Sequence, residues 1–346
     1  MRAVVYRGIG RVTVEEVPEP EVEDSRDAVV RVGVSAICAS DLHFLHGKAP
    51  LDPGDVMGHE AMGVVQSVGS AVERFRPGDR VAVAFHIACG DCWFCRRGQT
   101  QLCDEWRMLG GGLFGGELGG TQAELVRVPS ADVNLLALPD RIGDEPAVFL
   151  GDVLTTGVYG ASVAGIEPGD AVAVVGVGPV GHFCVQAARS HGPSELLALD
   201  LEPERLALAT RFGATAIDVR AHHPHTAVAE RTGGRGADVV IEAVGTPQAF
   251  ASALDVVRRG GRIAVVGMFT SETMPMQAGV WWTRALEVRF AGICPVHAHW
   301  DRARDQVLAG DLDPMPVVSH RLQLDEAPLG YELFASRRAT KVLLRP

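Results

Sequence analysis

A run of five apolar residues followed at once by a glycine-rich turn constrains the fold of this chain more than any other feature. Residues 171–175 are Ala-Val-Ala-Val-Val, residues 176–181 are Gly-Val-Gly-Pro-Val-Gly, and a helical pattern follows over 180–191. A strand without polar residues is buried on both faces of its sheet, and a short turn into a helix is typical of a parallel sheet covered by helices.

The same alternation of apolar runs and helical segments extends over the second half of the chain. It predicts further strands at 195–200, 237–243 and 261–267, and helices at 155–164, 203–211 and 248–257. We therefore expect an α/β fold in which residues 153–295 form a doubly wound parallel sheet of the Rossmann type.

The first 150 residues have a different pattern, with short valine-rich runs separated by Gly, Pro and Asp. It predicts a first strand near residues 1–6 and further strands at 28–34, 63–68, 80–84 and 123–128. After residue 295 a helix at 301–309 and a last strand at 340–344 are expected. We assign residues 1–152 and 296–346 to one β-rich domain and residues 153–295 to the other.

Length and charge exclude several classes of protein. The chain has 346 residues, which suggests about two domains, and its net charge of −11 argues against nucleic acid as a partner. No apolar run is long enough to cross a bilayer, and the N-terminus does not resemble a signal peptide. We expect a cytoplasmic protein with a small-molecule substrate and no membrane partner.

The turn at 176–181 fits the G-x-G-x-x-G pattern of dinucleotide sites, in the required position between a strand and a helix. Gly176 permits the tight turn, Gly178 lets the backbone approach a pyrophosphate, and Gly181 allows the helix to pack closely on the strand. Asp200 ends the next strand, where a carboxylate accepts hydrogen bonds from a ribose and disfavours a 2′-phosphate, so NAD is expected rather than NADP. The alternative is a glycine turn that only packs sheet against helix.

Four cysteines lie within one short segment in the pattern Cys89-x-x-Cys92-x-x-Cys95-x7-Cys103. Four thiolates at this spacing suit a closed tetrahedral zinc site with a structural role, because no position is left for a substrate. An iron–sulfur cluster and four unliganded thiols are the alternatives.

Three other stretches contain metal-ligand side chains: Cys38-Ala39-Ser40-Asp41-Leu42-His43, Gly58-His59-Glu60, and Gly151-Asp152 followed by Val-Leu-Thr-Thr-Gly. Each is unremarkable by itself, and the spacing alone leaves open whether they share a metal ion.

Taken together and in this order, these motifs resemble the zinc-containing alcohol dehydrogenases of the medium-chain dehydrogenase/reductase superfamily. The resemblance covers essentially the whole chain and is strongest to the bacterial secondary-alcohol and formaldehyde-dehydrogenase-like branches, in which an aspartate stands where other members have a cysteine. It implies a GroES-like catalytic domain beside the Rossmann domain, an active site in the cleft between them, and a homodimer or homotetramer.

The resemblance also implies roles for individual residues. Cys38, His59 and Asp152 would bind a catalytic zinc, with Glu60 beside it and Asp41 holding His59. Ser40 and His43 would form a proton relay. The predicted NAD(H) contacts are Thr156, Gly176, Gly178, Pro179, Val180, Gly181, Asp200, Arg205, Val244, Val266 and Lys341, with Arg205 at the ribose and Lys341 at the pyrophosphate.

The implied protein holds two Zn²⁺ ions per chain and exchanges hydride between NAD(H) and an alcohol or carbonyl compound. Three protein ligands leave a position on the catalytic zinc for the substrate oxygen. Polyol, threonine and dismutating formaldehyde dehydrogenases share these motifs, so the sequence does not separate them. A non-catalytic NAD-binding member of the superfamily is a further alternative, although such members often lack zinc ligands that this chain retains.

Overall fold

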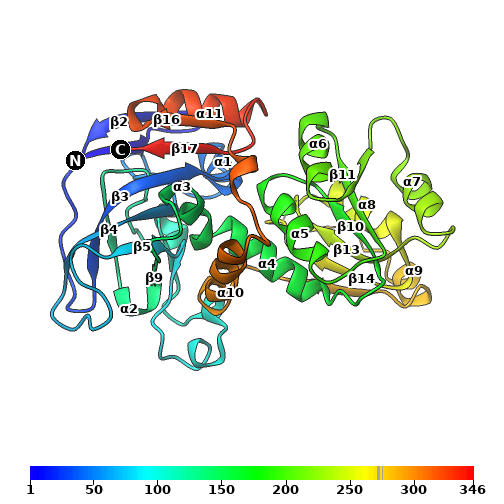
Figure 1. Ribbon diagram of the computed structural model, residues 1–346. Helices are drawn as coiled ribbons and strands as arrows, with labels where there is room; N and C mark the ends of the chain where they lie inside the picture. The colour runs from blue at the N-terminus through cyan, green and yellow to red at the C-terminus, as the bar shows by residue number, and fades with distance from the viewer. Residues whose placement is uncertain (271–272, 275) are drawn as a thin grey trace. The chain divides into compact units, whose positions relative to one another are not determined.

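A computed structural model describes residues 1–270, 273–274 and 276–346, which divide into two compact units. Unit 1 comprises Met1–Thr155, Pro295–Leu308 and Asp313–Pro346, and unit 2 comprises Thr156–Cys294 and Ala309–Leu312. Figure 1 shows a sheet in each unit.

Unit 2 contains an open parallel sheet with the strand order β12-β11-β10-β13-β14-β15. Every neighbouring pair in this sheet is parallel, as the apolar runs predicted. The order reverses beside β10, so the loops that follow the strands diverge there, which is where Rossmann sheets bind ligands. The strands are β10 (Ala171–Val175), β11 (Glu195–Asp200), β12 (Thr215–Asp218), β13 (Ala237–Glu242), β14 (Val257–Val265) and β15 (Glu287–Phe290).

Helices connect the parallel strands of unit 2, and four of them begin at a proline. Proline suits the first helical turn because its φ is already helical and its missing N–H would have no partner there. The helices are α4 (Val153–Ala164), α5 (Pro179–Arg189), α6 (Pro203–Arg211), α7 (Pro224–Arg231), α8 (Pro247–Val256) and α9 (Ala278–Thr283), and α4 starts in unit 1.

Unit 1 is built on a seven-stranded sheet with the order β16-β17-β3-β4-β5-β9, in which β8 also pairs with β3. Its pairs are antiparallel except for β16 with β17. These strands are β3 (Ala28–Ile37), β4 (Glu60–Val68), β5 (Arg80–Val83), β8 (Leu125–Val128), β9 (Leu135–Ala137), β16 (His320–Gln323) and β17 (Val342–Arg345). Two small antiparallel sheets pair β1 (Arg2–Tyr6) with β2 (Val12–Glu16) and β6 (His86–Ile87) with β7 (Arg107–Met108).

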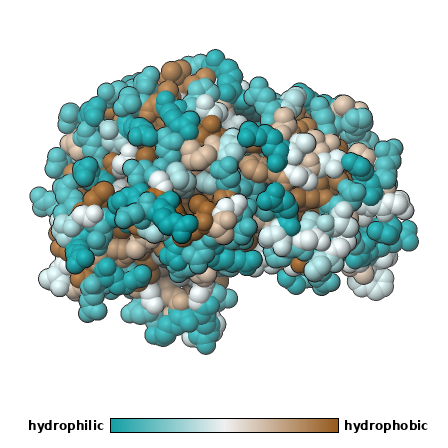
Figure 2. Space-filling model, viewed as in Figure 1, coloured by the Kyte–Doolittle hydropathy of each residue, from teal (hydrophilic) through white to brown (hydrophobic). Residues whose placement is uncertain are grey.

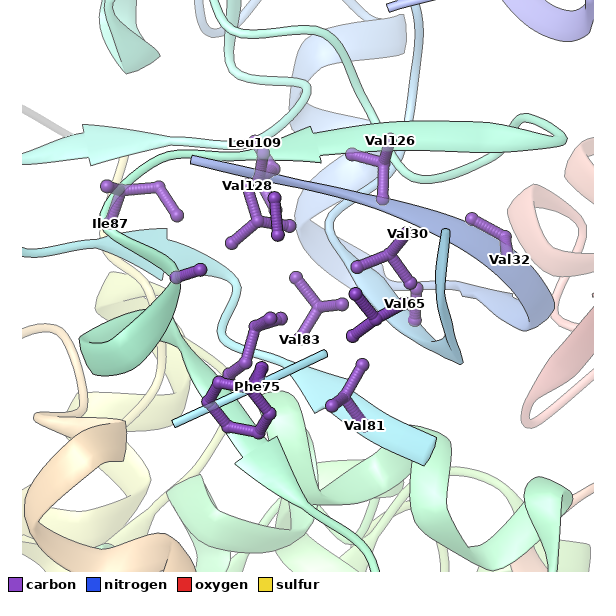
Figure 3. Close-up of a cluster of buried hydrophobic side chains, with 14 of the residues drawn as sticks. Val30, Val32, Val65, Phe75, Val81, Val83, Ile87, Leu109, Val126 and Val128 are labelled. Carbon is purple, nitrogen blue, oxygen red and sulfur yellow. The ribbon is translucent and has the colours of Figure 1, made fainter. Parts of the chain in front are cut away.

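A cluster of buried side chains from several of these strands forms part of the core of unit 1. Figure 3 shows Val30, Val65 and Val83 from β3, β4 and β5 pointing toward one another, with Phe75 beside them. β-Branched side chains pack well on a pleated sheet, which explains why valine dominates the strands of this unit.

Helices and 3₁₀ turns lie between the strands of unit 1. The helices are α1 (Ala39–Leu45), α2 (Ala131–Asn134), α3 (Asp144–Ala147), α10 (Val296–Ala309) and α11 (Ala327–Ala335). The 3₁₀ turns are η1 (Cys95–Arg97), η2 (Thr100–Leu102), η3 (Gly112–Gly115), η4 (Val148–Gly151), η5 (Met315–Val317) and η6 (Leu324–Glu326). Figure 1 shows α11 beside β16 and β17.

Most predicted elements are present, with shifted ends. The predicted strand 195–200 and helix 203–211 match β11 and α6. The helix predicted at 301–309 begins earlier, at Val296, because Val296 and Trp300 extend its buried face. The strand predicted at 261–267 also begins earlier, at Val257, because that residue pairs with Ala237 of β13.

No single helix in the described part of the chain is long and apolar enough to span a membrane. One bent pair of helical segments, Asp144–Gly151 with Val153–Ala164, passes the same test by length and composition. On the face shown in Figure 2, hydrophilic residues are interspersed with smaller apolar areas.

Candidate active site

The four clustered cysteines form a small lobe between β6 and β7. Cys89, Cys92, Cys95 and Cys103 place their sulfur atoms within 4.8 Å of one another, and the Sγ atoms of Cys89 and Cys95 are 4.0 Å apart. Zinc–sulfur bonds of about 2.3 Å in a tetrahedron separate the sulfurs by about 3.8 Å. The lobe therefore has the dimensions of a single tetrahedral ion held by four thiolates.

Backbone N–H groups point at the sulfurs of this lobe. The N–H groups of Cys92 and Cys95 donate to the sulfurs of Cys89 and Cys92, each at 3.4 Å, and those of Cys89 and Glu105 donate to Cys103 Sγ at 3.3 Å. Hydrogen bonds from the backbone lower the pKa of Cys92 to about 7, whereas burial raises the pKa of Cys89 to about 11. N–H donors favour thiolate over thiol, as metal binding requires.

The second cluster brings together the three stretches whose relation the spacing left open. Cys38, His59, Glu60 and Asp152 are all buried, and one ligand atom from each lies within 4.8 Å of the others. Asp152 Oδ2 is 3.3 Å from His59 Nε2 and 3.8 Å from Cys38 Sγ. Sulfur, imidazole nitrogen and carboxylate oxygen together are a donor set that suits zinc.

Each ligand stands at the end of an element. Cys38 follows β3 and is the N-cap of α1, whose third residue, Asp41, accepts the Cys38 N–H at 2.9 Å. His59 immediately precedes β4, and Asp152 immediately follows η4. The ends of β3 and β4 are adjacent because Ala36 pairs with Glu60. This strand pairing therefore holds Cys38 close to His59.

The electrostatics of the second cluster favour binding of a cation. Burial raises the pKa of the Cys38 thiol. Burial would lower the pKa of His59, but the charge of Asp41 and hydrogen bonds to Asp152 and Asp41 raise it well above its usual value. A divalent cation among these atoms would replace the protons on Cys38 and His59, so its binding would release protons.

Glu60 forms a buried ion pair with Lys341, and both side chains are inaccessible to solvent. Burial raises the pKa of Glu60. Burial also disfavours the charged form of Lys341, but the Glu60 carboxylate outweighs this effect, and the pKa of the lysine is raised overall. Glu60 Oε1 has no hydrogen-bond partner among the described residues. The predicted contact of Lys341 with a pyrophosphate gains no support from this buried position and stays a prediction.

The two predicted relay residues share helix α1. Ser40 Oγ lies 3.0 Å from His59 Nε2, so its hydroxyl group is at the ligand cluster. His43 follows on the same helix and is half-buried, and burial lowers its pKa. A hydroxyl beside the metal ligands and a neutral imidazole farther along the helix are groups that can accept a proton in turn.

In unit 2 the glycine turn has the geometry that its predicted role requires. Gly176 has φ +84°, and a Cβ on Gly181 would lie 2.0 Å from the Gly176 carbonyl oxygen. A Cβ on Gly178 would meet nothing closer than Arg205 Nη1, at 3.8 Å. Gly176 and Gly181 are thus required for the turn and its packing, whereas the backbone at Gly178 stays open to a ligand.

Asp200 is held in place at this turn by three backbone N–H groups. One carboxylate oxygen accepts from Val177 at 2.7 Å, and the other accepts from Leu201 at 2.7 Å and from Glu202 at 2.9 Å. A carboxylate oxygen has two lone pairs, so Asp200 retains capacity to accept a ribose hydroxyl. Its first task in the fold is to join the glycine turn to the end of β11.

The other predicted cofactor contacts lie near the same turn or at the ends of later strands. Val244 follows β13, is 45% exposed, and its Cγ2 would lie 2.1 Å from a Cβ on Gly176. Pro179 and Val180 begin α5, Val266 follows β14, and Thr156 lies in α4. Pro179, Val180, Val244 and Val266 thus lie at one edge of the parallel sheet.

Sequence reasoning missed a buried carboxylate at this edge. Glu242 ends β13, and its Oε1 accepts the N–H groups of Val244 at 2.9 Å and Gly245 at 2.8 Å. Burial raises the pKa of Glu242. The signal was available, since a glutamate closes the otherwise apolar run 239–241, and a charge in such a place has to bind something.

Two known family models match this chain. Residues 24–140 match the family model of the alcohol dehydrogenase GroES-like domain, and residues 179–303 match that of the zinc-binding dehydrogenases. A zinc-type alcohol dehydrogenase-like protein of Bacillus subtilis (strain 168) is 37% identical over 380 residues, covering 100% of both chains. The chain belongs to the zinc-containing alcohol dehydrogenase family. Its predicted membership of the medium-chain dehydrogenase/reductase superfamily is confirmed.

Solved structures of zinc-containing alcohol dehydrogenases show the same fold. The alcohol dehydrogenase TADH from Thermus sp. ATN1 is 43% identical, with a TM-score of 0.95, covering 100% of this chain and 99% of its own. A candidate zinc-binding dehydrogenase from Sinorhizobium meliloti 1021, solved bound to NADP, is 31% identical with a TM-score of 0.88, covering 100% of this chain and 99% of its own. The expected GroES-like and Rossmann-type domains are thereby confirmed, and the chain is an alcohol dehydrogenase-like oxidoreductase.

Proposed function

We propose that this protein is a zinc-dependent dehydrogenase that exchanges hydride between NAD(H) and an alcohol or carbonyl substrate, with a second zinc in the cysteine lobe. One observation carries the proposal: the buried cluster of Cys38, His59, Glu60 and Asp152, whose ligand atoms lie within 4.8 Å of one another. Charged and metal-binding groups are rarely gathered in a protein interior unless they bind an ion or take part in chemistry.

In this proposal Cys38, His59 and Asp152 are the three protein ligands of the catalytic zinc. A fourth position then remains for the substrate oxygen. When bound there, zinc acts as a Lewis acid that makes an alcohol hydroxyl more acidic and polarises a carbonyl group. Glu60 is balanced by Lys341, so the negative charge next to the ligands is partly neutralised.

Ser40 and His43 are the proposed path for the proton. The Ser40 hydroxyl is close enough to the ligand cluster, 3.0 Å from His59 Nε2, to accept a hydrogen bond from a substrate hydroxyl and pass the proton on. His43 lies on the same helix and is partly exposed, so it can exchange that proton with solvent.

The cysteine lobe is proposed to hold a structural zinc. Its four sulfurs complete a tetrahedron and leave no position for a substrate. Sulfur atoms within 4.8 Å of one another favour a single ion over the iron–sulfur cluster that the spacing left open. Backbone N–H donors to three of the four sulfurs support the thiolate state that a bound ion requires.

The nicotinamide cofactor is proposed to bind at the glycine turn of unit 2, with its pyrophosphate at Gly178 and the N-terminus of α5. Asp200 would receive the adenosine ribose and disfavour a 2′-phosphate, so NAD is preferred. The NADP-bound relative makes this preference worth measuring. The predicted domain roles and a homodimer or homotetramer remain further parts of the proposal.

A substrate screen tests the proposal. Purified protein is mixed with NAD and a panel of primary alcohols, secondary alcohols, polyols, threonine and aldehydes, and NADH formation is followed by absorbance. Turnover of at least one class is expected, together with two zinc ions per chain by elemental analysis. A folded protein with fewer than two zinc ions and no turnover would instead be the non-catalytic NAD-binding member of the superfamily.

The cofactor assignment has its own test with any substrate that the screen finds. We expect kcat/KM for NAD to exceed that for NADP by at least about tenfold, since a 2′-phosphate beside Asp200 meets like charge. The Asp200→Gly variant should lose much of this preference. Equal kcat/KM values for the two cofactors in the unmodified protein would contradict the role given to Asp200.

A further inference from the structure

A row of side chains in polar contact extends from the His59 ligand to a helix near the C-terminus. Asp41 Oδ1 is 3.1 Å from His59 Nδ1, Gln122 Nε2 donates to Asp41 Oδ2 at 3.1 Å, and the Tyr331 hydroxyl donates to Gln122 Oε1 at 2.8 Å. All four side chains are buried, with exposed fractions of 2% or less. They come from α1, the residue before β4, the segment before β8, and α11.

The chemistry of Gln122 sets the direction of this row. Its Nε2 faces two acceptors, the Ala36 carbonyl at 3.2 Å and the Asp41 carboxylate, so the NH₂ group has to point that way. An exchanged amide would place its oxygen against two other oxygens, which is unfavourable in a buried site. The carbonyl end of Gln122 therefore faces Tyr331 and needs a donor there.

Tyr331 is suited to be that donor. Its ring lies in α11 with 2% exposure, and burial raises the pKa of its hydroxyl well above the usual value, so the proton stays on the oxygen. The protonated phenol donates to Gln122 Oε1 at 2.8 Å. Gln122 Oε1 is thus satisfied, and the amide has no reason to rotate.

The space around Gln122 allows little movement. Its backbone N–H donates to the Met57 carbonyl at 2.9 Å, which joins it to the chain just before His59. A Cβ on Gly58 would lie 2.4 Å from Gln122 Cγ, so the side chain fills the space beside that glycine. The amide and the His59 ligand are therefore parts of one packed unit.

The orientation of the row determines which nitrogen of His59 can bind a metal. Asp41 Oδ1 lies 3.1 Å from Nδ1, and this negative charge favours the proton of a neutral His59 on Nδ1, which leaves Nε2 with its lone pair facing Asp152 and Cys38. Asp41 Oδ2 also accepts the backbone N–H of Cys38 at 2.9 Å. The acceptor that Gln122 holds in place thus touches two of the three proposed zinc ligands.

We propose that Gln122 and Tyr331 are positioning residues for the catalytic zinc, acting through Asp41 on His59 and Cys38. The inference rests on the proposed function, because it assumes that these ligands bind zinc. Outer partners of a metal-bound histidine raise metal affinity by fixing its tautomer and ring orientation. The row adds two further members, which sequence analysis did not single out because each is an ordinary polar residue in an otherwise unremarkable segment.

The test measures zinc affinity rather than turnover. Full-length protein is equilibrated in zinc buffers set by chelators of graded strength, and bound zinc per chain is measured by elemental analysis. The Cys38→Ser variant, which should retain only the lobe zinc, identifies the transition that belongs to the catalytic site. The lobe zinc then serves as an internal standard in every variant.

We expect Asp41→Asn to weaken the catalytic site by about 10- to 100-fold, the usual loss for a partner of a metal-bound histidine. Tyr331→Phe should weaken it by about 2- to 12-fold, the equivalent of one net hydrogen bond. Tyr159→Phe is the matched control, because it removes a hydroxyl that donates to the Ala291 carbonyl at 2.9 Å within unit 2. Neither tyrosine variant should change the affinity of the lobe.

The Gln122→Met variant and the double variant complete a thermodynamic cycle. If Tyr331 acts through Gln122, the loss caused by Tyr331→Phe should disappear when residue 122 is already methionine. A variant that does not fold, as judged by circular dichroism, is left out. The zinc affinity of Tyr331→Phe compared with that of Tyr159→Phe then decides whether Tyr331 has a positioning role.

The outcomes separate this inference from the proposed function. If the unmodified protein binds no zinc that Cys38→Ser removes, the proposed function itself fails. If that zinc is present and Tyr331→Phe leaves its affinity equal to that of Tyr159→Phe, only the positioning role is wrong. If Tyr331→Phe weakens zinc binding at the lobe as much as at the catalytic site, the variant destabilises the protein in general, and the positioning role is again wrong.

Discussion

The two candidate metal sites of this protein are assembled in opposite ways. The lobe takes all its ligands from residues 89–103, whereas the second cluster takes Cys38, His59 and Asp152 from three segments that lie far apart in the chain. A local site needs only its own loop to fold, but a dispersed site exists only once β3, β4 and η4 have packed. The first should therefore tolerate changes elsewhere in unit 1, and the second should not.

The surroundings of the two sites differ in the same sense. Backbone N–H groups contact the lobe sulfurs, and two of its cysteines are only partly buried. Buried side chains surround the second cluster: Asp41 contacts His59, and Lys341 contacts Glu60. Backbone donors depend little on residue type, whereas side-chain partners depend on it entirely. Single substitutions farther from the metal ligands should therefore weaken metal binding at the second cluster more than at the lobe.

The largest expected effect comes from removing one ligand of the dispersed cluster. Cys38→Ser should lower bound zinc from two ions to one per chain and reduce kcat/KM by at least about 1000-fold, or about 4 kcal/mol, because the Lewis acid is lost. The measurements are elemental analysis and steady-state kinetics on the substrate found in the screen.

Cys184→Ser is the matched control for this variant, since Cys184 is a buried thiol outside both clusters. It should retain two zinc ions. Near-normal turnover of Cys38→Ser with one bound zinc would show that the ligand assignment is wrong. The second cluster could then no longer be contrasted with the lobe as the catalytic metal site.

Removing one lobe ligand should affect stability instead of chemistry. Cys103→Ser is expected to lose the lobe zinc and to lower Tm by on the order of 10 °C, because the binding energy of a structural zinc is folding energy. The folded fraction should keep the other zinc and a kcat/KM within about threefold of the unmodified protein. Thermal unfolding, zinc analysis and kinetics on the same preparation check this. Complete loss of turnover in a folded, one-zinc Cys103→Ser protein would mean that the two sites are not independent.

The smallest expected effect concerns the contact between the lobe and α10. His297 forms a hydrogen bond through each ring nitrogen: Nδ1 is 2.9 Å from Thr100 Oγ1, and Nε2 is 2.8 Å from Asn134 Oδ1. Burial lowers the pKa of His297 well below its usual value. Between the lowered pKa of folded His297 and about pH 6.5, the imidazole is protonated in the unfolded chain but not in the folded one. The contribution of His297 to the free energy of unfolding is therefore fully present above about pH 6.5 and is lost as pH falls.

The slope from this one group is at most about 1.4 kcal/mol per pH unit. His297→Gln keeps a polar side chain but cannot titrate, so its free energy of unfolding should fall less between pH 7.5 and pH 5.5. Urea unfolding of both proteins, saturated with zinc, gives the difference. His299→Gln on the same helix is the control. It should flatten the slope less, because His299 is only partly buried and burial lowers its pKa less far than that of His297. Identical slopes for the unmodified protein and His297→Gln would contradict the assignment.

The parts of the fold that are local in sequence were predicted well. The apolar runs and helical patterns of unit 2 predicted β10, β11 and α6 with the observed ends, because each strand and helix is decided by residues next to one another. The start of α10 was predicted too late, since Val296 and Trp300 become a helical face only by packing against the rest of unit 1.

The candidate sites divide along the same line. Spacing alone pointed to the four-cysteine lobe, and a strand, a glycine turn and a helix in succession pointed to the dinucleotide edge. Resemblance to a family, and not spacing, suggested that Cys38, His59 and Asp152 belong together. The pairing of Lys341 with Glu60, the turn-holding Glu242, and the addition of Gln122 and Tyr331 to the predicted contact of Asp41 with His59 were not predicted at all.

The sequence by itself determined the elements whose contacts lie within a few residues: the strand–turn–helix units and the lobe that a short loop can close. Only the tertiary structure decided which distant polar residues meet, because Gln122 and Tyr331 leave no periodic or spacing signal in the chain. Their meaning arises from burial, where every donor has to find an acceptor, and that requirement acts only after β3, β4 and α11 have come together.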